Sequence, residues 1–256
     1  MTVKEPIVAQ ALVANAGPSD TLRASALKVL SRIFAASVVG YLLAAPFLSL
    51  GRGAIAAALL LLLLIFAIVL HGLRHHRFER FGPANTVTAI RAALVCIVAA
   101  AVCCASLPQS GGKWLWVLAI LAFSLDAVDG YLARRYHLES PLGARFDMEI
   151  DAMLILCLSA AAFLLEKAGV WVLLIGLMRY AFILAQSAMP RLNAPLPASF
   201  RRKFVCVVQI VVLCLVLLPQ VAVPVSSWLA AAALVLLTYS FAADCVYLVR
   251  RADDVR

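Results

Sequence analysis

The run AIAAALLLLLLIFAIVLHG at residues 54–72 decides the fold class, because it contains no acidic, lysine or arginine side chain. An α-helix needs about 20 apolar residues to cross the hydrocarbon core of a bilayer. The whole chain has the same character, with 65% hydrophobic residues, 14% charged residues and a mean hydropathy of +1.01. Soluble domains have about 45–50% apolar and about 25% charged residues. The composition therefore predicts an all-α, polytopic transmembrane helical bundle, and excludes a secreted globular enzyme, a disordered chain and a disulfide scaffold.

Seven further apolar runs follow or precede this one, and short links rich in Gly, Pro or charged residues separate them. Eighteen of the 22 Lys and Arg residues fall in the tails and links on one side of this map, and three fall on the other. Because Lys and Arg collect in cytoplasmic loops, this asymmetry predicts that both termini are cytoplasmic. It also accounts for the net charge of +9 without a nucleic-acid partner. The eight predicted spans are residues 34–50, 54–72, 86–107, 114–134, 146–165, 170–188, 204–219 and 226–249.

Three parts are predicted along the chain. Residues 1–32 form a cytoplasmic tail, in which residues 22–32 are either a short amphipathic helix on the membrane surface or a simple cationic flank. Residues 33–79 contain two of the predicted transmembrane helices, and residues 80–256 contain the other six.

Four aspartates lie inside or at the end of predicted spans: Asp126, Asp129, Asp147 and Asp151. The first two are three residues apart and the last two are four apart, so each pair shares one helix face. An Asp at mid-bilayer costs about 2.5–3.5 kcal/mol, so we expect the four carboxylates to face one cavity and to share cations. A ligand set of oxygens alone suits Mg²⁺ or Mn²⁺ rather than zinc, and magnesium bound in this way usually takes phosphate oxygens as well.

Other ionisable residues in the spans also need partners. Arg91 lies one turn into its span and needs an anion or an acid, and Arg179 lies deep in its span, where a phosphate or one of the four aspartates is the expected partner. Glu149 is expected to point to the other side of its helix, toward a polar neighbour or a headgroup. Asp244 is expected to reach the membrane interface or a nearby arginine. A role as the N-cap of its helix is enough to explain Asn85 when that residue is considered by itself.

The motif Asp126-x2-Asp129-Gly130-x2-Ala133-Arg134-x8-Gly143-x3-Asp147-x3-Asp151 resembles the signature of the CDP-alcohol phosphotransferases. The resemblance implies a membrane enzyme with a core of six transmembrane helices, to which this chain adds two N-terminal helices. It implies transfer of a phosphatidyl group from a CDP-linked lipid, usually CDP-diacylglycerol, to the hydroxyl of a polar alcohol, with release of CMP. It implies that the four aspartates hold one or two Mg²⁺ or Mn²⁺ ions and that Asp151 is also the base. We further expect a homodimer, a cytoplasmic active site and a location in a bacterial inner membrane.

The resemblance also implies binding residues. Five are expected to approach the CDP-linked lipid: Asn85, Gly130, Arg134, Ser140 and Gly143. Three basic residues are expected to meet the acceptor or its phosphate: Arg91, Arg179 and Lys203. Simpler explanations exist for some of these, since Ser140 before Pro141 fits a turn, and Arg134 and Lys203 fit cationic anchors at the membrane interface.

The motif gives less information about the acceptor alcohol than about the reaction. Family members that use glycerol phosphate usually carry Pro after the third Asp and Lys soon after the fourth, whereas Met148 follows Asp147 here and Ala152 follows Asp151. Glycerol phosphate is therefore disfavoured. Two alternatives to the enzyme are a divalent-cation transporter with an Asp-lined path and a non-catalytic membrane partner. Neither explains the spacing of Gly130, Arg134 and Gly143.

Overall fold

The computed structural model describes residues 19–75, 78, 80–104, 111–136, 140–189 and 199–254. This part of the chain is helical and contains no strand, which confirms the predicted all-α bundle. Two 3₁₀ turns, η1 (Leu73–His75) and η2 (Val170–Val172), follow α3 and precede α7. The long helices are α2 (Asp20–Leu48), α3 (Arg52–Gly72), α4 (Pro83–Cys104), α5 (Gly111–Arg135), α6 (Pro141–Leu164), α7 (Leu173–Ala188), α8 (Phe200–Val216) and α9 (Val225–Asp254).

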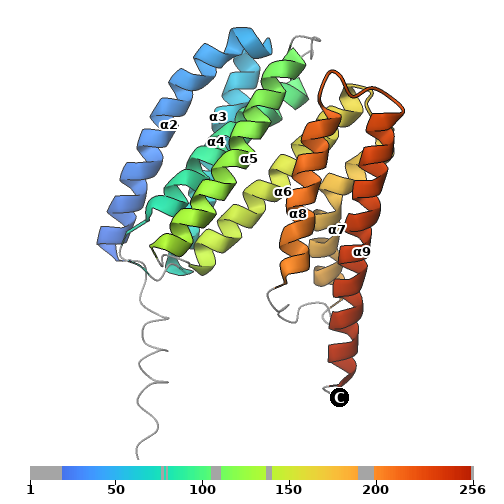
Figure 1. The fold of residues 1–256 in the computed structure, drawn as a ribbon. Helices are drawn as coiled ribbons and strands as arrows, with labels where there is room; N and C mark the ends of the chain where they lie inside the picture. The colour runs from blue at the N-terminus through green and yellow to red at the C-terminus, as the bar shows by residue number, and fades with distance from the viewer. Residues whose placement is uncertain are drawn as a thin grey trace, which may run out of the picture.

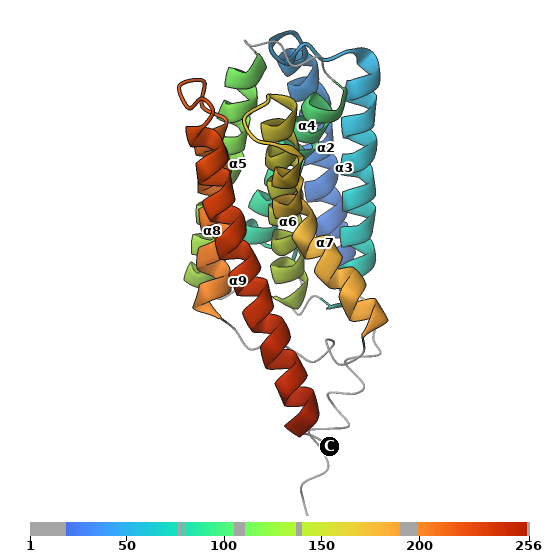
Figure 2. The same ribbon diagram turned by 90° about the vertical axis from the view of Figure 1, so that its right-hand side faces the viewer.

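The helices form two groups joined by α6. In Figure 1, α2 to α5 lie together on the left and α7 to α9 lie together on the right, with α6 between them. Helix α6 packs against α4 in the first group and against α7 and α8 in the second. Successive helices run in alternate directions, so the start of α6 and the ends of α5 and α7 lie at one end of the bundle (Figures 1 and 2).

Helix α4 is the central element of the first group. Of its apolar segment, 67% is buried, compared with 17–28% in the other helices that could span a membrane. It packs against α2, α3, α5 and α6. Buried small residues such as Ala89, Ala92 and Ala101 let these neighbours approach closely. Polar side chains on the inner face of α4 are therefore held inside the protein.

Among the described residues, six helices are long and apolar enough to cross a membrane, so the chain is a multi-pass membrane protein. The other two long helices differ for physical reasons: α8 has 17 residues, and the first half of α6 carries Arg145, Asp147, Glu149 and Asp151. The six candidate spans are Asp20–Leu48, Arg52–Gly72, Pro83–Cys103, Lys113–Leu132, Val170–Ala188 and Val225–Leu248.

Most of the described helices begin earlier than the apolar runs predict, and the difference is largest at α2 and α6. Helix α2 begins at Asp20, so residues 22–32 and the first predicted span form one continuous helix. The Ser19 hydroxyl caps it by accepting from the Leu22 amide at 3.3 Å. Helix α6 begins at Pro141, with Ser140 as its N-cap, rather than at residue 146. Capping residues, and not the end of the apolar run, set these starts.

Lys167 ties two links together at the end of the bundle opposite the start of α6. Its ammonium donates to the carbonyls of Leu218 at 3.1 Å and Val221 at 2.7 Å. The hydroxyls of Ser226 and Ser227 donate to the Lys167 carbonyl at 2.6 and 3.2 Å. Four hydrogen bonds thus join the α6–η2 link to the α8–α9 link and to the first turn of α9.

Candidate active site

Helices α5 and α6 bring the four predicted aspartates together, and we call Asp126, Asp129, Asp147 and Asp151 the aspartate cluster. The first two lie in the second half of α5 and the other two in the first half of α6. Carboxylate oxygens of Asp126, Asp129 and Asp147 all lie within 4.8 Å of one another. The exposed fraction of the side chain falls from 37% at Asp147 to 24% at Asp126, 15% at Asp151 and 5% at Asp129. The cluster is therefore open at Asp147 and closed at Asp129.

Arg91 from α4 lies among these carboxylates, and its side chain is fully buried. Its Nη1 is 3.1 Å from Asp126 Oδ1 and 2.9 Å from Asp129 Oδ2, and it also contacts Asp147 Oδ1. Its Nη2 contacts Asp151 Oδ1. The expectation that Arg91 pairs with an acid is confirmed. One guanidinium links all four members of the cluster.

The charge of the cluster is only partly balanced, because one guanidinium faces four carboxylates. Buried or half-buried charges require partners, so the remaining negative charge favours a further cation. All the available ligand atoms of the cluster are carboxylate oxygens, which are the ligands that Mg²⁺ and Mn²⁺ prefer. The donor set therefore fits the predicted divalent cation.

Polar residues in the first turns of α4 support the cluster. Thr88 donates to Asp129 Oδ2 at 3.0 Å. The Asn85 side chain donates to the carbonyl of Phe81 at 2.6 Å and so does not cap the helix, contrary to the simple explanation of this residue. A Cβ atom at Gly143 would lie 2.6 Å from Asn85 Oδ1. Only glycine at this position allows the start of α6 to approach Asn85 so closely.

Three of the five residues predicted to bind the CDP-linked lipid lie together at the start of α6. These are Asn85, Ser140 and Gly143, and the buried Ser140 hydroxyl accepts from the Gly143 amide at 3.0 Å. Gly130 is half-buried in α5, directly after Asp129. The Arg134 side chain lies outside the described residues.

Arg179 has a different partner from the one expected. Its guanidinium pairs with Glu149, and not with a member of the aspartate cluster. The reason is the face that each residue occupies: Arg179 lies on α7, and Glu149 lies two residues from both Asp147 and Asp151, on the other side of α6. The polar neighbour expected for Glu149 is thereby confirmed. Arg179 Nε is buried and has no hydrogen-bond partner among the described residues.

The three basic residues at the start of α8 have different surroundings: one is exposed, and two pair with an aspartate on α9. Lys203 is exposed in the first turns of α8. Arg201 Nη2 lies 2.5 Å from Asp244 Oδ1, and Arg202 Nη1 lies 3.4 Å from the same oxygen. The arginine partner expected for Asp244 is confirmed. This pair joins α8 to α9 outside the aspartate cluster.

Cys206 is a neighbour of the cluster that the sequence did not single out. Its thiol lies 3.9 Å from Asp151 Oδ2, so α8 forms a further wall of the site. The indole of Trp116 on α5 donates to the Cys214 carbonyl at 3.0 Å and holds α8 against α5. A cysteine in an apolar run is usually a small hydrophobic residue, and nothing in the sequence distinguishes this one.

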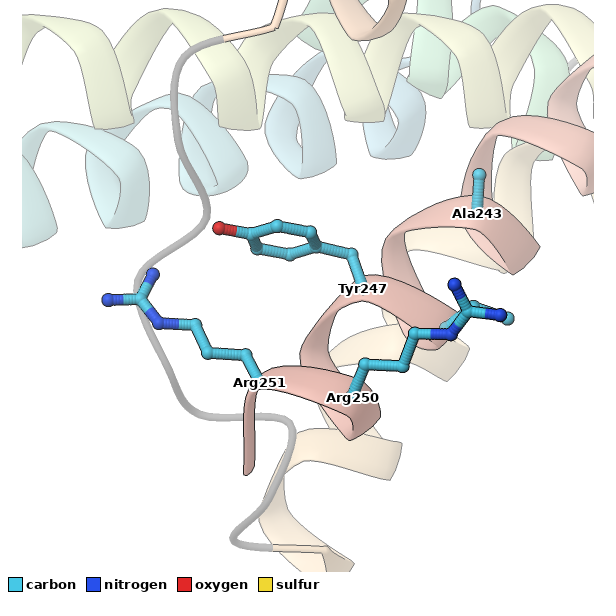
Figure 3. A pocket seen from close by; sticks show the side chains of 5 residues that line it. Ala243, Tyr247, Arg250 and Arg251 are labelled. Carbon is cyan, nitrogen blue, oxygen red and sulfur yellow. The ribbon is translucent and has the colours of Figure 1, made fainter. Parts of the chain in front are cut away.

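A surface hollow of about 520 Å³ lies elsewhere, near the C-terminal end of α9. It is lined by Ala243, Val246, Tyr247, Arg250 and Arg251, none of which belongs to the predicted site. In Figure 3, Tyr247 and Arg251 extend to one side of α9 and Arg250 extends to the other. The hollow and the aspartate cluster share no residue.

Comparison with known proteins agrees with the motif. A family model described as CDP-alcohol phosphatidyltransferase matches residues 81–239. The match spans more than half of the chain and includes the whole aspartate cluster, Arg91, Arg179 and Lys203. No curated protein and no solved structure matches the chain.

Proposed function

Because this chain belongs to the CDP-alcohol phosphatidyltransferase family, we propose that it moves a phosphatidyl group from CDP-diacylglycerol to the hydroxyl of a polar alcohol and releases CMP. Family membership makes the protein a membrane transferase of phospholipid biosynthesis. The proposal adds the lipid donor and the acceptor class. The observation that carries it is the convergence of Asp126, Asp129 and Asp147 within 4.8 Å around Arg91.

The aspartate cluster is proposed to hold one or two Mg²⁺ or Mn²⁺ ions. Three carboxylates at mutual ligand distance and a cluster with excess negative charge support this role. A divalent cation bound there would neutralise charge on the diphosphate and on the leaving CMP.

Asp151 is proposed to be the base. It accepts the proton of the acceptor hydroxyl while the acceptor oxygen bonds to the phosphorus that carries diacylglycerol, and the bond from that phosphorus to the oxygen of CMP breaks. Arg91 contacts Asp151 Oδ1, and the Cys206 thiol lies near Oδ2. These contacts fix the orientation of the carboxylate, so its effect comes from position near the reacting hydroxyl.

The CDP-linked lipid is proposed to bind beside the start of α6, where Asn85, Ser140 and Gly143 lie together. Gly130 and Arg134, in the last turns of α5, complete this part of the proposal. A half-buried Gly130 gives a ligand close access to the helix, and an arginine at the position of Arg134 suits a phosphate.

The acceptor is proposed to bind near Arg179 and Lys203. Arg179 supports this role through a buried Nε that no described residue engages, and Lys203 through its exposure at the start of α8. Arg91 has no nitrogen left for a phosphate. Its Nη1 and Nη2 donate to the aspartate cluster, and its Nε donates to the Ala122 carbonyl at 3.2 Å.

The membrane arrangement is proposed to include α6 and α8 as spans, giving eight in total, with both termini and the aspartate cluster on the cytoplasmic side. The alternate directions of the eight helices and the one-sided Lys and Arg distribution support this topology. We propose a homodimer in a bacterial inner membrane, as the motif resemblance suggests.

The proposed reaction is tested by measuring CMP released by the purified, detergent-solubilised protein. The assay contains CDP-diacylglycerol, Mg²⁺ and, one at a time, glycerol phosphate, inositol phosphate, serine and choline as acceptors. We expect release with at least one acceptor, and loss of release when the metal is chelated or in Asp151→Asn.

Asp244→Asn is the matched control, because Asp244 is a buried, arginine-paired aspartate outside the cluster. It should keep the CMP release of the wild type. Failure of every acceptor, or equal release by Asp151→Asn and wild type, would reject the proposed reaction. Uptake of Mn²⁺ into liposomes without CMP release would instead identify a transporter.

A further inference from the structure

The Arg91 guanidinium lies where a cation bound by the aspartate cluster has to lie. Its Nη1 contacts Asp126, Asp129 and Asp147, the same three carboxylates whose ligand atoms lie within 4.8 Å of one another. We infer that the guanidinium and a divalent cation compete for this one position, so that metal binding requires Arg91 to withdraw Nη1. The inference rests on the proposed function, which assigns the cation to this cluster.

Both distance and charge oppose simultaneous occupancy. Magnesium takes oxygen ligands at about 2.0–2.1 Å, so a cation held by the three carboxylates fills the small space between them. Nη1 already lies in that space, at 3.1 Å from Asp126 and 2.9 Å from Asp129. Both groups are positive, and their repulsion in a partly buried site is strong.

The remaining contacts of Arg91 allow Nη1 to move while the side chain stays in the protein. The guanidinium is fully buried by α4, α5 and α6 and cannot leave for water. Nη2 contacts Asp151, and Nε donates to the Ala122 carbonyl at 3.2 Å. Because the guanidinium is planar and rigid, Nη1 moves only when the whole group turns, and the Asp151 carboxylate and the Ala122 carbonyl are then available to its other donors.

The competition has two consequences for the protein. Before metal binds, Arg91 offsets the repulsion among the carboxylates and so stabilises the junction of α4, α5 and α6. When metal binds, the displaced guanidinium opposes it and lowers the affinity. A neutral side chain at position 91 should therefore weaken the protein without metal and strengthen metal binding.

Calorimetric titration of Mn²⁺ into the purified full-length protein tests this directly. Because a repelling charge is removed, we expect Arg91→Gln to bind Mn²⁺ at least about tenfold more tightly than the wild type. Arg91→Lys keeps the charge and should stay within about threefold of the wild type. Arg201→Gln is the matched control, because it removes an arginine from an aspartate pair outside the cluster, and its Mn²⁺ affinity should be unchanged.

Thermal unfolding of the same proteins gives a second readout. In chelator, Arg91→Gln should melt below the wild type, and saturating Mn²⁺ should raise its midpoint by more than it raises that of the wild type. Mn²⁺ binding by Arg91→Gln that equals or falls below the wild-type affinity overturns the inference.

The variant Asp147→Asn separates this inference from the proposed function. If the wild type shows no saturable Mn²⁺ binding, or if Asp147→Asn binds as well as the wild type, the proposed metal site itself fails. If Asp147→Asn weakens binding but Arg91→Gln does not strengthen it, only the competition fails. Should Arg91→Gln not fold, a structure of the Mn²⁺-loaded wild type decides. Mn²⁺ among the three carboxylates with Nη1 displaced supports the inference, and Nη1 in its present contacts overturns it.

Discussion

Two arginines inside the helices illustrate how burial determines the free energy that an ion pair contributes to stability. Arg91 is fully buried, and removing one partner of such a pair costs about 3–5 kcal/mol because the others remain charged and unpaired. The pair of Arg179 and Glu149 is 26% and 53% exposed, and pairs of that kind contribute about 0–1 kcal/mol. Arg91 therefore has a large structural role, whereas Arg179 can exchange its partner for a substrate at little cost.

A substitution pair tests the proposed acceptor role of Arg179. If Arg179 binds the acceptor, Arg179→Gln should raise the KM for the alcohol by about tenfold or more, which corresponds to about 1.4 kcal/mol of lost binding. Glu149→Gln breaks the same ion pair but keeps the arginine, so it should change KM by less than about twofold. Steady-state CMP release at varied acceptor concentration measures both. Equal effects of the two variants would mean that the ion pair, and not the arginine, matters.

The absence of a side chain at Gly143 allows the start of α6 to lie close to α4. In Gly143→Ala the new Cβ would lie 2.6 Å from Asn85 Oδ1 and 3.2 Å from Ser140 Oγ, so the start of α6 must shift. We expect a lower thermal midpoint and a loss of CMP release of about tenfold or more, because small displacements at a site have large kinetic effects.

Gly40→Ala is the control for Gly143→Ala. It adds the same methyl group inside α2, where a Cβ meets nothing within 4 Å, and it should leave the thermal midpoint unchanged or slightly raised. Wild-type stability and activity in Gly143→Ala would contradict the close packing of α6 on Asn85.

At the scale of helices, α6 is the element on which the site depends most. It supplies Asp147 and Asp151 to the cluster, contacts α4, α7 and α8, and presents Glu149 to Arg179 on α7. The start of α6 is set by Ser140 and Gly143. Its far end is held through Lys167, whose contacts join two links of the second group.

The Lys167 contacts predict a stability effect separate from catalysis. Lys167→Met removes two half-buried hydrogen bonds from an ammonium to carbonyls, and bonds to charged groups are worth about 1.5–3 kcal/mol each, with the lower value expected where solvent has access. The thermal midpoint should fall by about 2–4 °C per kcal/mol lost. CMP release at 25 °C should be retained, because the contacts lie at the opposite end of α6 from the aspartates.

Lys113→Met serves as the comparison for this prediction, since Lys113 is an exposed lysine at the start of α5. It should melt with the wild type. If Lys167→Met melts with the wild type too, the two hydrogen bonds of the Lys167 ammonium do not hold the links together.

The helices were more predictable than their ends. Within the described residues, apolar runs located all eight long helices, because the bilayer requires long stretches without charge. They misplaced the starts of α2 and α6, since a helix continues through polar residues until a cap such as Ser19 or Ser140 ends it. Hydropathy indicates which segments can lie in the bilayer, whereas capping residues determine where each helix begins.

Features of the candidate site that depend on spacing within one helix were predictable from the sequence. Contacts that depend on how two helices pack together were not. The spacing of Asp126 with Asp129, and of Asp147 with Asp151, fixes each pair on one face. The partner of Arg179 depends on how α7 packs on α6, and no spacing along the chain contains that information. For the same reason Cys206 beside Asp151 was not foreseen.

At the scale of the whole molecule, charge is distributed in two distinct ways. Most Lys and Arg residues lie in the tails and links on one predicted side, and this asymmetry is the basis of the proposed orientation. The aspartate cluster lies between α5 and α6 toward the same end of the bundle, with Arg91 as its internal counterion. So many carboxylates gathered between the helices of a membrane protein point to a functional site.

The central claim is that the aspartate cluster is the active centre of a CDP-alcohol phosphatidyltransferase. The most direct test is Mg²⁺-dependent CMP release from CDP-diacylglycerol by the wild type, Asp151→Asn and Asp244→Asn in one assay. We predict release by the wild type and Asp244→Asn with at least one alcohol, and none above background by Asp151→Asn. Equal release by all three proteins, or none by the wild type with any acceptor, would contradict the account.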